Sequence, residues 1–299
     1  MTQSSTTLLS TSARFAASLV TASAILLTGC AGTSPTSSVA ATTTAQYYPA
    51  CYEPVSHLRS TEDAVKSSAI TGAVAGGLLG AAAGALTGGD HAARNAAIGA
   101  AGGALVGGAA GYYTGKQKQI ADDNERIGSY ATDIERSTGE IDRSVGYAKA
   151  AQSCYQQQFT SLQAARKAKT MSDADGRARL AEIVSGLKET NALLAAADGR
   201  TGEDLDAYTQ AYEKDLEQTG VQRDTVTKVA QADTGAKVTV TKAERAKVST
   251  QAVSTEKATQ KAKASRTESQ KVASAGKTMV SSVCNNPDMG DWAPASCKV

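Results

Sequence analysis

The sequence predicts an all-α protein in which a glycine-rich helical hairpin is followed by long helices in a bundle or coiled-coil arrangement. Three observations support this fold class. Aromatic residues make up only 4% of the chain, whereas strands favour aromatic and β-branched side chains. No proline lies between Pro54 and Pro287, which permits very long helices. Two runs of glycines recur at every fourth residue, which places each run on one face of a helix.

Residues 1–29 have the features of a bacterial lipoprotein signal peptide. One cation, Arg14, precedes a mostly apolar stretch over 15–27, which is shorter than the roughly 20 residues that span a bilayer. The sequence Leu27-Thr28-Gly29-Cys30 resembles the bacterial lipobox. That resemblance implies cleavage before Cys30 and a covalent lipid anchor, including an acyl chain such as palmitate, on this cysteine; the alternative is an ordinary signal peptide cut nearby. The small residues after Cys30 then favour the outer membrane, with the rest of the chain facing the periplasm.

Residues 30–58 are expected to form a lipid-anchored flexible tether. Residues 31–50 are rich in Ser, Thr, Ala and Pro. Such a composition buries too little apolar surface to order itself.

Residues 59–118 are expected to form the glycine-rich hairpin. The uncharged stretches 67–89 and 95–115 are each about long enough to cross a bilayer, and the polar residues 90–94 join them. A glycine row lets another backbone approach closely. We therefore favour a membrane-inserted or membrane-associated, self-associating hairpin over a soluble hairpin packed on the chain or a flexible linker. The helix-packing candidates are Gly72, Gly76, Gly80, Gly84, Gly88, Gly99, Gly103, Gly107, Gly111 and Gly115.

These rows resemble the glycine-zipper domains of outer-membrane lipoproteins from Gram-negative bacteria. The resemblance rests on the glycine spacing over about residues 67–118 and on the Tyr-containing end of the second row, residues 111–116. It implies membrane association and a location in the cell envelope, and it specifies no activity.

Residues 119–283 are expected to form an extended helical or coiled-coil region. A seven-residue period favours coiled-coil-like packing on another copy or on a later helix of the chain, with an ordinary amphipathic helix as the alternative. Helix starts are predicted at Ser172 and at Thr201, with a break near Gly199. Residues 237–241 suit a helix or a short strand, and residues 242–283 a solvated helix or partial disorder. The heptad positions are Ile120, Ile127, Ile134, Ile141, Ala148, Tyr155 and Leu162.

Charge is divided between two regions of the chain. Residues 173–224 contain 12 acidic and 6 basic side chains, whereas residues 237–278 contain 10 basic and 3 acidic ones. The simpler interpretation is mutual attraction between two solvated helices. The alternative is a basic arm for an anionic envelope polymer or for lipid headgroups. Aromatic residues do not alternate with the bases, and the net charge is only +2, so nucleic acid is not expected as a partner.

Four cysteines remain if Cys30 carries lipid: Cys51, Cys154, Cys284 and Cys297. An exported compartment permits disulfides. We favour Cys284–Cys297, which would close a C-terminal loop over 284–299, together with Cys51–Cys154. Other pairings, or reduced thiols, are the alternatives.

No catalytic residue, metal site or cofactor is predicted, apart from the lipid on Cys30. His57 and His91 lack the neighbours that a metal site requires. Asp173, Asp175 and Glu182 echo a calcium loop but are interpreted as helix capping. The expected function is a non-enzymatic, structural role in cell-envelope integrity. The expected partners are outer-membrane lipid and further copies of the chain, with the cell wall or other envelope proteins as further candidates. The alternative function is a pore-forming or secretion-machinery accessory oligomer built from such hairpins.

Overall fold

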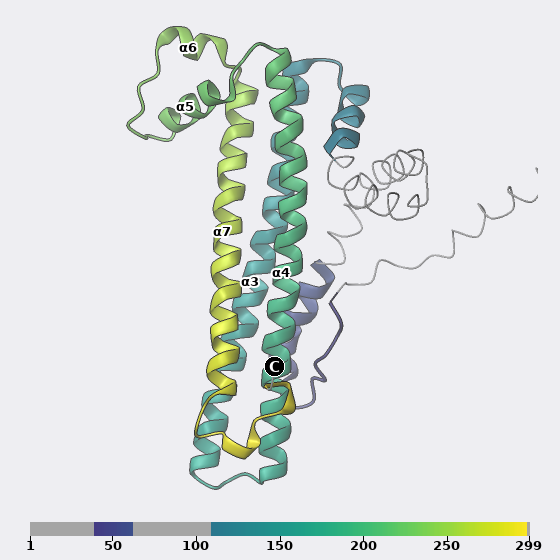
Figure 1. Ribbon diagram of the computed structural model, residues 1–299, viewed down its shortest axis with the longest axis vertical. Helices are drawn as coiled ribbons and strands as arrows, with labels where there is room; N and C mark the ends of the chain where they lie inside the picture. The colour runs from purple at the N-terminus through teal and green to yellow at the C-terminus, as the bar shows by residue number, and fades with distance from the viewer. Residues whose placement is uncertain (1–38, 62–108, 298–299) are drawn as a thin grey trace, which may run out of the picture. The chain divides into compact units, whose positions relative to one another are not determined.

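The computed structural model describes residues 39–61 and 109–297, and the description below is confined to them (Figure 1). Within these ranges the chain is helical and contains no strand, which confirms the predicted all-α class. Residues 49–61 and 109–119 are helical. The other helices are α3 (Asp123–Lys167), α4 (Asp173–Gln218), α5 (Arg223–Asp233), α6 (Lys242–Lys247) and α7 (Thr250–Cys284), followed by short 3-10 turns at Gly290–Trp292 and Ala295–Cys297.

The core of the molecule is a bundle of α3, α4 and α7, which run side by side (Figure 1). The heptad positions of α3 from Ile127 to Leu162 are all buried against the other two helices. Ile120 precedes α3 and is only half-buried. The partners of the seven-residue stripe are therefore later helices of the same chain.

The expected break near Gly199 is wrong, because α4 is one continuous helix. Its start is as predicted: the Ser172 hydroxyl accepts a hydrogen bond from the Asp175 amide at 3.1 Å. Thr201 lies buried in mid-helix and starts no new helix. Leu194 and Leu205 are buried on either side of this region, so packing offsets the low helix propensity of its glycines.

Residues 242–283 form α6 and α7, and α7 is a packed member of the bundle instead of a solvated helix or a partly disordered segment. Its buried face consists mainly of small residues, such as Ala258 and Ala262. Close packing requires Gly276, because a Cβ there would lie 1.9 Å from Asn191 Oδ1. Residues 237–241 are irregular and form neither the helix nor the strand that we expected.

Candidate functional site: two junctions beside the glycine-rich segment

The first junction consists of residues 39–61, which precede the glycine rows and pack on α3 and α4. The prediction of a flexible tether over 30–58 is wrong for residues 39–58. Tyr48, Val55 and Leu58 are buried in the core of the bundle, and the main chain before them is hydrogen-bonded to α4. The composition of residues 39–58 could not indicate this ordered structure, because the carboxylates that bind their main chain belong to α4. Residues 30–38 lie outside the described residues.

Two buried glutamates of α4 hold the main chain of the first junction. Glu189 Oε2 accepts hydrogen bonds from the Thr42 and Thr43 amides at 3.0 and 2.9 Å. About two turns earlier along α4, the Glu182 carboxylate accepts hydrogen bonds from the amides of residues 46, 47 and 48 at 3.1, 2.7 and 2.8 Å. Those amides directly precede the helix over 49–61, so Glu182 fixes the main chain where it enters this helix.

Glu189 also receives the cation of the first junction. Arg59 Nη2 lies 2.5 Å from Glu189 Oε1, and Arg59 Nη1 donates to the Val39 carbonyl at 2.6 Å. Burial acts to raise the pKa of the Glu189 carboxyl, but the bonds from Arg59, Thr43 and Thr42 outweigh it and hold this pKa below its usual value. The charged form of Glu189 therefore stabilises the attachment of residues 39–43.

A disulfide completes the first junction. Cys51 is bonded to Cys154 of α3, with a Cα–Cα distance of 5.3 Å. Cys284 is bonded to Cys297 in the C-terminal loop. Both bonds follow the pairing that the sequence analysis favoured. His57 stacks on Tyr147 of α3 at a ring-centroid distance of 5.2 Å, whereas His91 lies outside the described residues.

The second junction is the helical segment 109–119, which follows the glycine rows. The Tyr112 hydroxyl donates to Asp133 Oδ2 at 2.5 Å, and Lys116 Nζ lies 2.6 Å from the same oxygen. The Tyr112 ring lies 4.8 Å from the Tyr208 ring of α4. The last part of the uncharged stretch 95–115 therefore packs on the bundle, contrary to the expectation that the whole stretch serves as a membrane segment.

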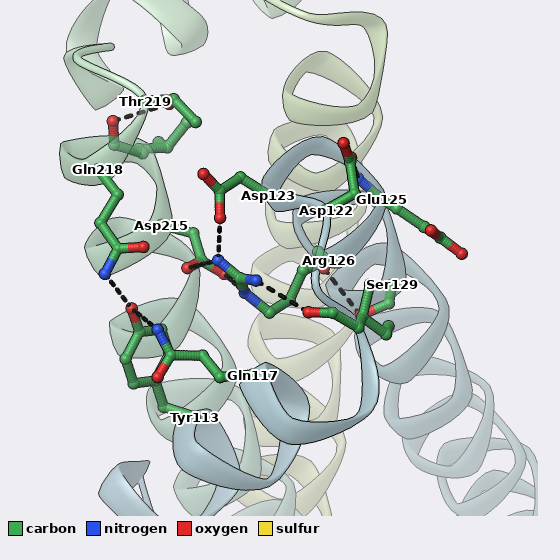
Figure 2. A network of polar contacts seen from close by, with 12 residues as sticks. Tyr113, Gln117, Asp122, Asp123, Glu125, Arg126, Ser129, Asp215, Gln218 and Thr219 are labelled. Carbon is green, nitrogen blue, oxygen red and sulfur yellow. Dashed lines mark hydrogen bonds and ion pairs between the residues drawn. The ribbon is translucent and has the colours of Figure 1, made fainter.

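A network of polar contacts lies beside the second junction (Figure 2). Arg126 of α3 points its guanidinium at Asp215 of α4, with Nε–Oδ2 and Nη2–Oδ1 distances of 2.8 and 2.7 Å. Tyr130 donates to Asp215 Oδ2 at 2.6 Å. Tyr113 bridges the junction to the bundle, since its hydroxyl accepts from Gln218 at 2.8 Å (Figure 2).

The buried ion pair in this network favours the charged forms of both Arg126 and Asp215. Asp215 is fully buried and Arg126 is 3% exposed. The hydrogen bonds to Asp215 raise the pKa of Arg126 although burial opposes it, and burial together with Asp215 raises the pKa of Tyr130. The buried ion pair therefore ties the start of α3 to the end of α4 next to the second junction.

Both junctions lie on the side of the bundle away from α7. Successive helical residues are rotated by about 100°, so the α4 residues at the first junction lie roughly 150° from those against α7. The former are Glu182, Ser185 and Glu189, and the latter are Asn191, Asp198 and Gly202. The same division holds on α3, where Asp133, Tyr147 and Cys154 contact the junctions and Lys149 and Gln152 contact α7.

The two junctions are separated along the bundle. The second contacts α3 at Asp133 and the first contacts it at Tyr147. These positions are 14 residues apart, which corresponds to about 21 Å along a helix. The bundle therefore holds the chain on both sides of residues 62–108 at two defined levels of one face.

Ten glycines were predicted to pack helices, and only two of them fall within the described residues. Gly111 and Gly115 lie in the second junction, and a Cβ at Gly115 would meet nothing within 4 Å. Gly72, Gly76, Gly80, Gly84, Gly88, Gly99, Gly103 and Gly107 lie outside the described residues, as does Cys30. The glycines that do pack closely inside the bundle, such as Gly186 against Tyr155, are ones that the sequence analysis did not select.

A groove of about 640 Å³ lies between residues 39–47 and α4. Ala178, Ala181 and Ala192 contribute to its lining, beside Glu182 and Glu189. Both carboxylates already accept hydrogen bonds from main-chain amides of the first junction, so their role there is structural. Within the described residues no group of three or more His, Cys, Asp or Glu side chains is arranged to hold a metal ion.

The fold and its two junctions define a class of protein: a helical bundle on which both segments that flank a glycine-rich stretch are packed. Residues 71–118 match the family model Gly-zipper_Omp, whose description is "Glycine zipper". The chain therefore contains a glycine-zipper domain, as the resemblance implied, and a zipper of this Omp type indicates a protein associated with the outer membrane.

No match was found among curated proteins, and none among solved structures. Within the described ranges, no helix combines the length and the apolar character that crossing a membrane requires.

Sequence reasoning missed the residues that build the junctions. Glu182 and Glu189 are seven apart and lie among buried positions of α4 such as Ile183 and Leu187. That spacing of two acids beside an apolar stripe was a signal that a partner segment lies against them.

The attachment of residues 39–43 is expected to weaken in acid. Because the pKa of Glu189 is lowered in the folded state, its contribution is complete above the unfolded value of 4.5 and is lost as pH falls through the folded value. We expect the protection factors of the Thr42 and Thr43 amides, which compare their exchange rates with those of the unfolded chain at the same pH, to fall over that range. Glu189→Gln should remove this pH dependence, whereas Glu53→Gln on the exposed surface should retain it.

Global stability is a poor readout of this effect. Burial, together with Glu140, raises the pKa of Asp204 to about 6. Asp204 therefore contributes with the opposite sign, destabilising the fold as pH rises from its unfolded value of 3.8 towards 6. Unchanged protection factors at Thr42 and Thr43 down to pH 3 would contradict the role of Glu189.

Proposed function

We propose that this chain is a non-enzymatic lipoprotein of the outer membrane, anchored through Cys30 and facing the periplasm. In this role it associates with itself through its glycine zipper and tethers other envelope components. The observation that carries the proposal is that one face of the bundle holds both flanks of the zipper as well as the segment that follows Cys30.

The distance between Cys30 and the first junction supports an anchor close to the bundle. Val39 lies nine positions after Cys30, and its carbonyl accepts a hydrogen bond from Arg59. At no more than about 3.3–3.6 Å per residue, the chain can extend about 30 Å from the bundle to the lipid. A lipid on Cys30 would therefore keep the first junction within about 30 Å of the membrane surface.

The anchor is tested by metabolic labelling and fractionation. Wild-type protein should incorporate radiolabelled palmitate and sediment with outer membranes, and Cys30→Ser should incorporate none. Cys284→Ser is the control, because it removes a cysteine from the mature chain and leaves the lipobox intact. Equal labelling of Cys30→Ser and wild type would contradict the anchor.

Self-association is tested at the described end of the second glycine row. Gly115 faces open space within the chain, so Gly115→Leu should leave the bundle folded and occupy room that a second copy would use. We expect chemical crosslinking between copies to fall at least twofold, with an unchanged melting temperature.

Gly146→Leu provides the matched control. Gly146 also lies in a helix with nothing within 4 Å of a Cβ, and it is outside both glycine rows. It should crosslink like the wild type. If Gly115→Leu and Gly103→Leu both crosslink normally, the zipper does not mediate association. Discrete conductance steps in planar bilayers would favour the pore-forming alternative.

A further inference from the structure

The connection between α5 and α6 contains a short stretch with the character of a strand, residues 237–241, which we call the β-prone segment. Its sequence is Lys-Val-Thr-Val-Thr, and strands favour valine and threonine. Val238 and Val240 are half-buried, whereas the residues between and beside them are exposed, which is the alternation of a strand. The segment lies outside the bundle of α3, α4 and α7 (Figure 1).

Most main-chain groups of the β-prone segment have no hydrogen-bond partner. The amides of Lys237, Thr239 and Val240 find no acceptor within the described residues, and the carbonyls of residues 237–240 find no donor there. None of these residues has a positive φ, so their backbone is compatible with a strand. Unpaired amides and carbonyls along such a segment form a template on which another strand can pair.

The fold holds both ends of the β-prone segment. Before it, Asp233 at the end of α5 lies 2.7 Å from Arg245 of α6 and 3.4 Å from Lys257 of α7. At its other end, Thr241 and Glu244 form a capping box that starts α6. Because its ends are fixed, the segment loses less conformational entropy when it pairs than a free peptide would.

The β-prone segment is complementary to a second copy of itself in one antiparallel register. If Thr239 of one copy lies opposite Thr239 of the other, then Val238 lies opposite Val240 and Lys237 lies opposite Thr241. The valines of both copies then meet on one face, where cross-strand pairs of apolar side chains stabilise a sheet. No two lysines lie opposite each other.

Other arrangements of two such segments lose these pairs. A shift by two residues in either direction places one of the valines opposite Ala236 or Lys242. A parallel, in-register pair places Lys237 beside its own copy, where like charges repel. The favoured arrangement is therefore antiparallel and two-fold symmetric, as expected for a contact between identical chains.

The β-prone segment lies towards the end of the bundle at which the second junction packs. Tyr113 of the second junction accepts a hydrogen bond from Gln218 at the end of α4, and α5 begins shortly afterwards at Arg223. An association of two copies through the glycine zipper therefore raises the local concentration of one segment near the other.

We propose that the β-prone segments of two copies pair as antiparallel strands about a two-fold axis at Thr239. A two-stranded pair is marginal by itself in water, so it adds to an association that the zipper begins. In this respect the proposal rests on the self-association in the proposed function. It gives that association a second, sequence-specific contact outside the membrane.

The first test places a cysteine at the centre of the pair, in the full-length protein in detergent micelles. Opposite Cα atoms of antiparallel strands lie about 4.5–5.5 Å apart, within the range of about 4.4–6.8 Å that a disulfide spans. Thr239→Cys should therefore form a disulfide between copies on mild oxidation, which non-reducing electrophoresis detects.

Ala236→Cys provides the matched control. Ala236 is also exposed and lies in the same connection, but the two copies of this residue would be about 20 Å apart in the proposed register. We expect at least about fivefold more disulfide dimer from Thr239→Cys than from Ala236→Cys.

The second test removes main-chain donors that the described fold does not use. T239P/V240P deletes two amides that have no acceptor there, so its melting curve by circular dichroism should match that of the wild type. Chemical crosslinking between copies should fall at least about threefold, because proline cannot donate to a strand pair. T239A/V240A keeps both amides and should lose less.

The strand pairing is overturned if Thr239→Cys and Ala236→Cys crosslink equally, or if T239P/V240P associates like the wild type. It is also overturned if T239A/V240A is as weak as T239P/V240P, because the contact would then depend on side chains alone. Wild-type protein that does not crosslink at all would overturn the proposed self-association as well. Normal wild-type crosslinking without a preference for Thr239→Cys would overturn the strand pairing only.

Discussion

Asp215→Ala is expected to lower the free energy of unfolding by about 3–5 kcal/mol, because it leaves the Arg126 guanidinium buried without its main counter-ion. Tyr130 would lose its hydrogen-bond acceptor at the same time. Chemical denaturation followed by circular dichroism measures the change. The second junction should loosen too, since it packs beside this network.

Two further variants separate the ion pair from a general effect of substitution in α4. Glu217→Ala removes an exposed acid two residues away and should change the unfolding free energy by less than about 0.5 kcal/mol. Arg126→Met combined with Asp215→Leu removes both charges and should be less destabilised than Asp215→Ala alone. A double variant at least as unstable as Asp215→Ala would show that the uncompensated charge is not the cause.

Replacing Cys51 and Cys154 together with serine is expected to cost about 4.7 kcal/mol if restriction of the unfolded chain dominates. The bond joins residues 103 apart in the sequence, and the loop it closes contains the whole glycine-zipper segment. Denaturation without reductant gives the stability, and protease cleavage between residues 39 and 61 reports release of the first junction.

The second disulfide is the natural comparison. Cys284 and Cys297 are only 13 residues apart, so their joint replacement should cost about 3 kcal/mol on the same basis. It should also leave the first junction resistant to protease. A larger loss from this pair would mean that packing around Trp292, whose ring lies against Gly176, matters more than loop closure.

Patterns that repeat along one helix were predictable. The seven-residue stripe of α3 is buried from Ile127 to Leu162, and Ser172 caps α4 as expected. The four-residue glycine spacing was sufficient to indicate a glycine zipper, which the family match confirms. In each case the signal is local, because residues three, four or seven apart share one face of a helix.

Features that depend on a distant partner were not predictable in the same way. Residues 39–48 are rich in Thr and Ala and looked unable to order themselves, yet Glu182 and Glu189 bind their main chain from more than 130 residues away. α7 lacks Leu, Ile and Phe, and its burial depends on close contact at Gly276. Neither the acceptor carboxylates nor the space for such contacts can be seen within the segment itself.

The sequence alone determined the helical class, the position of the glycine zipper and the residues that form the stripe of α3. Only the tertiary structure decided that both flanks of the zipper lie on one face of the bundle and that α7 packs on the opposite side of α3 and α4. The physical reason is that helical periodicity acts between neighbours in the chain. Burial of a carboxylate, or the pairing of a lysine, is settled by whichever groups folding brings within hydrogen-bond distance.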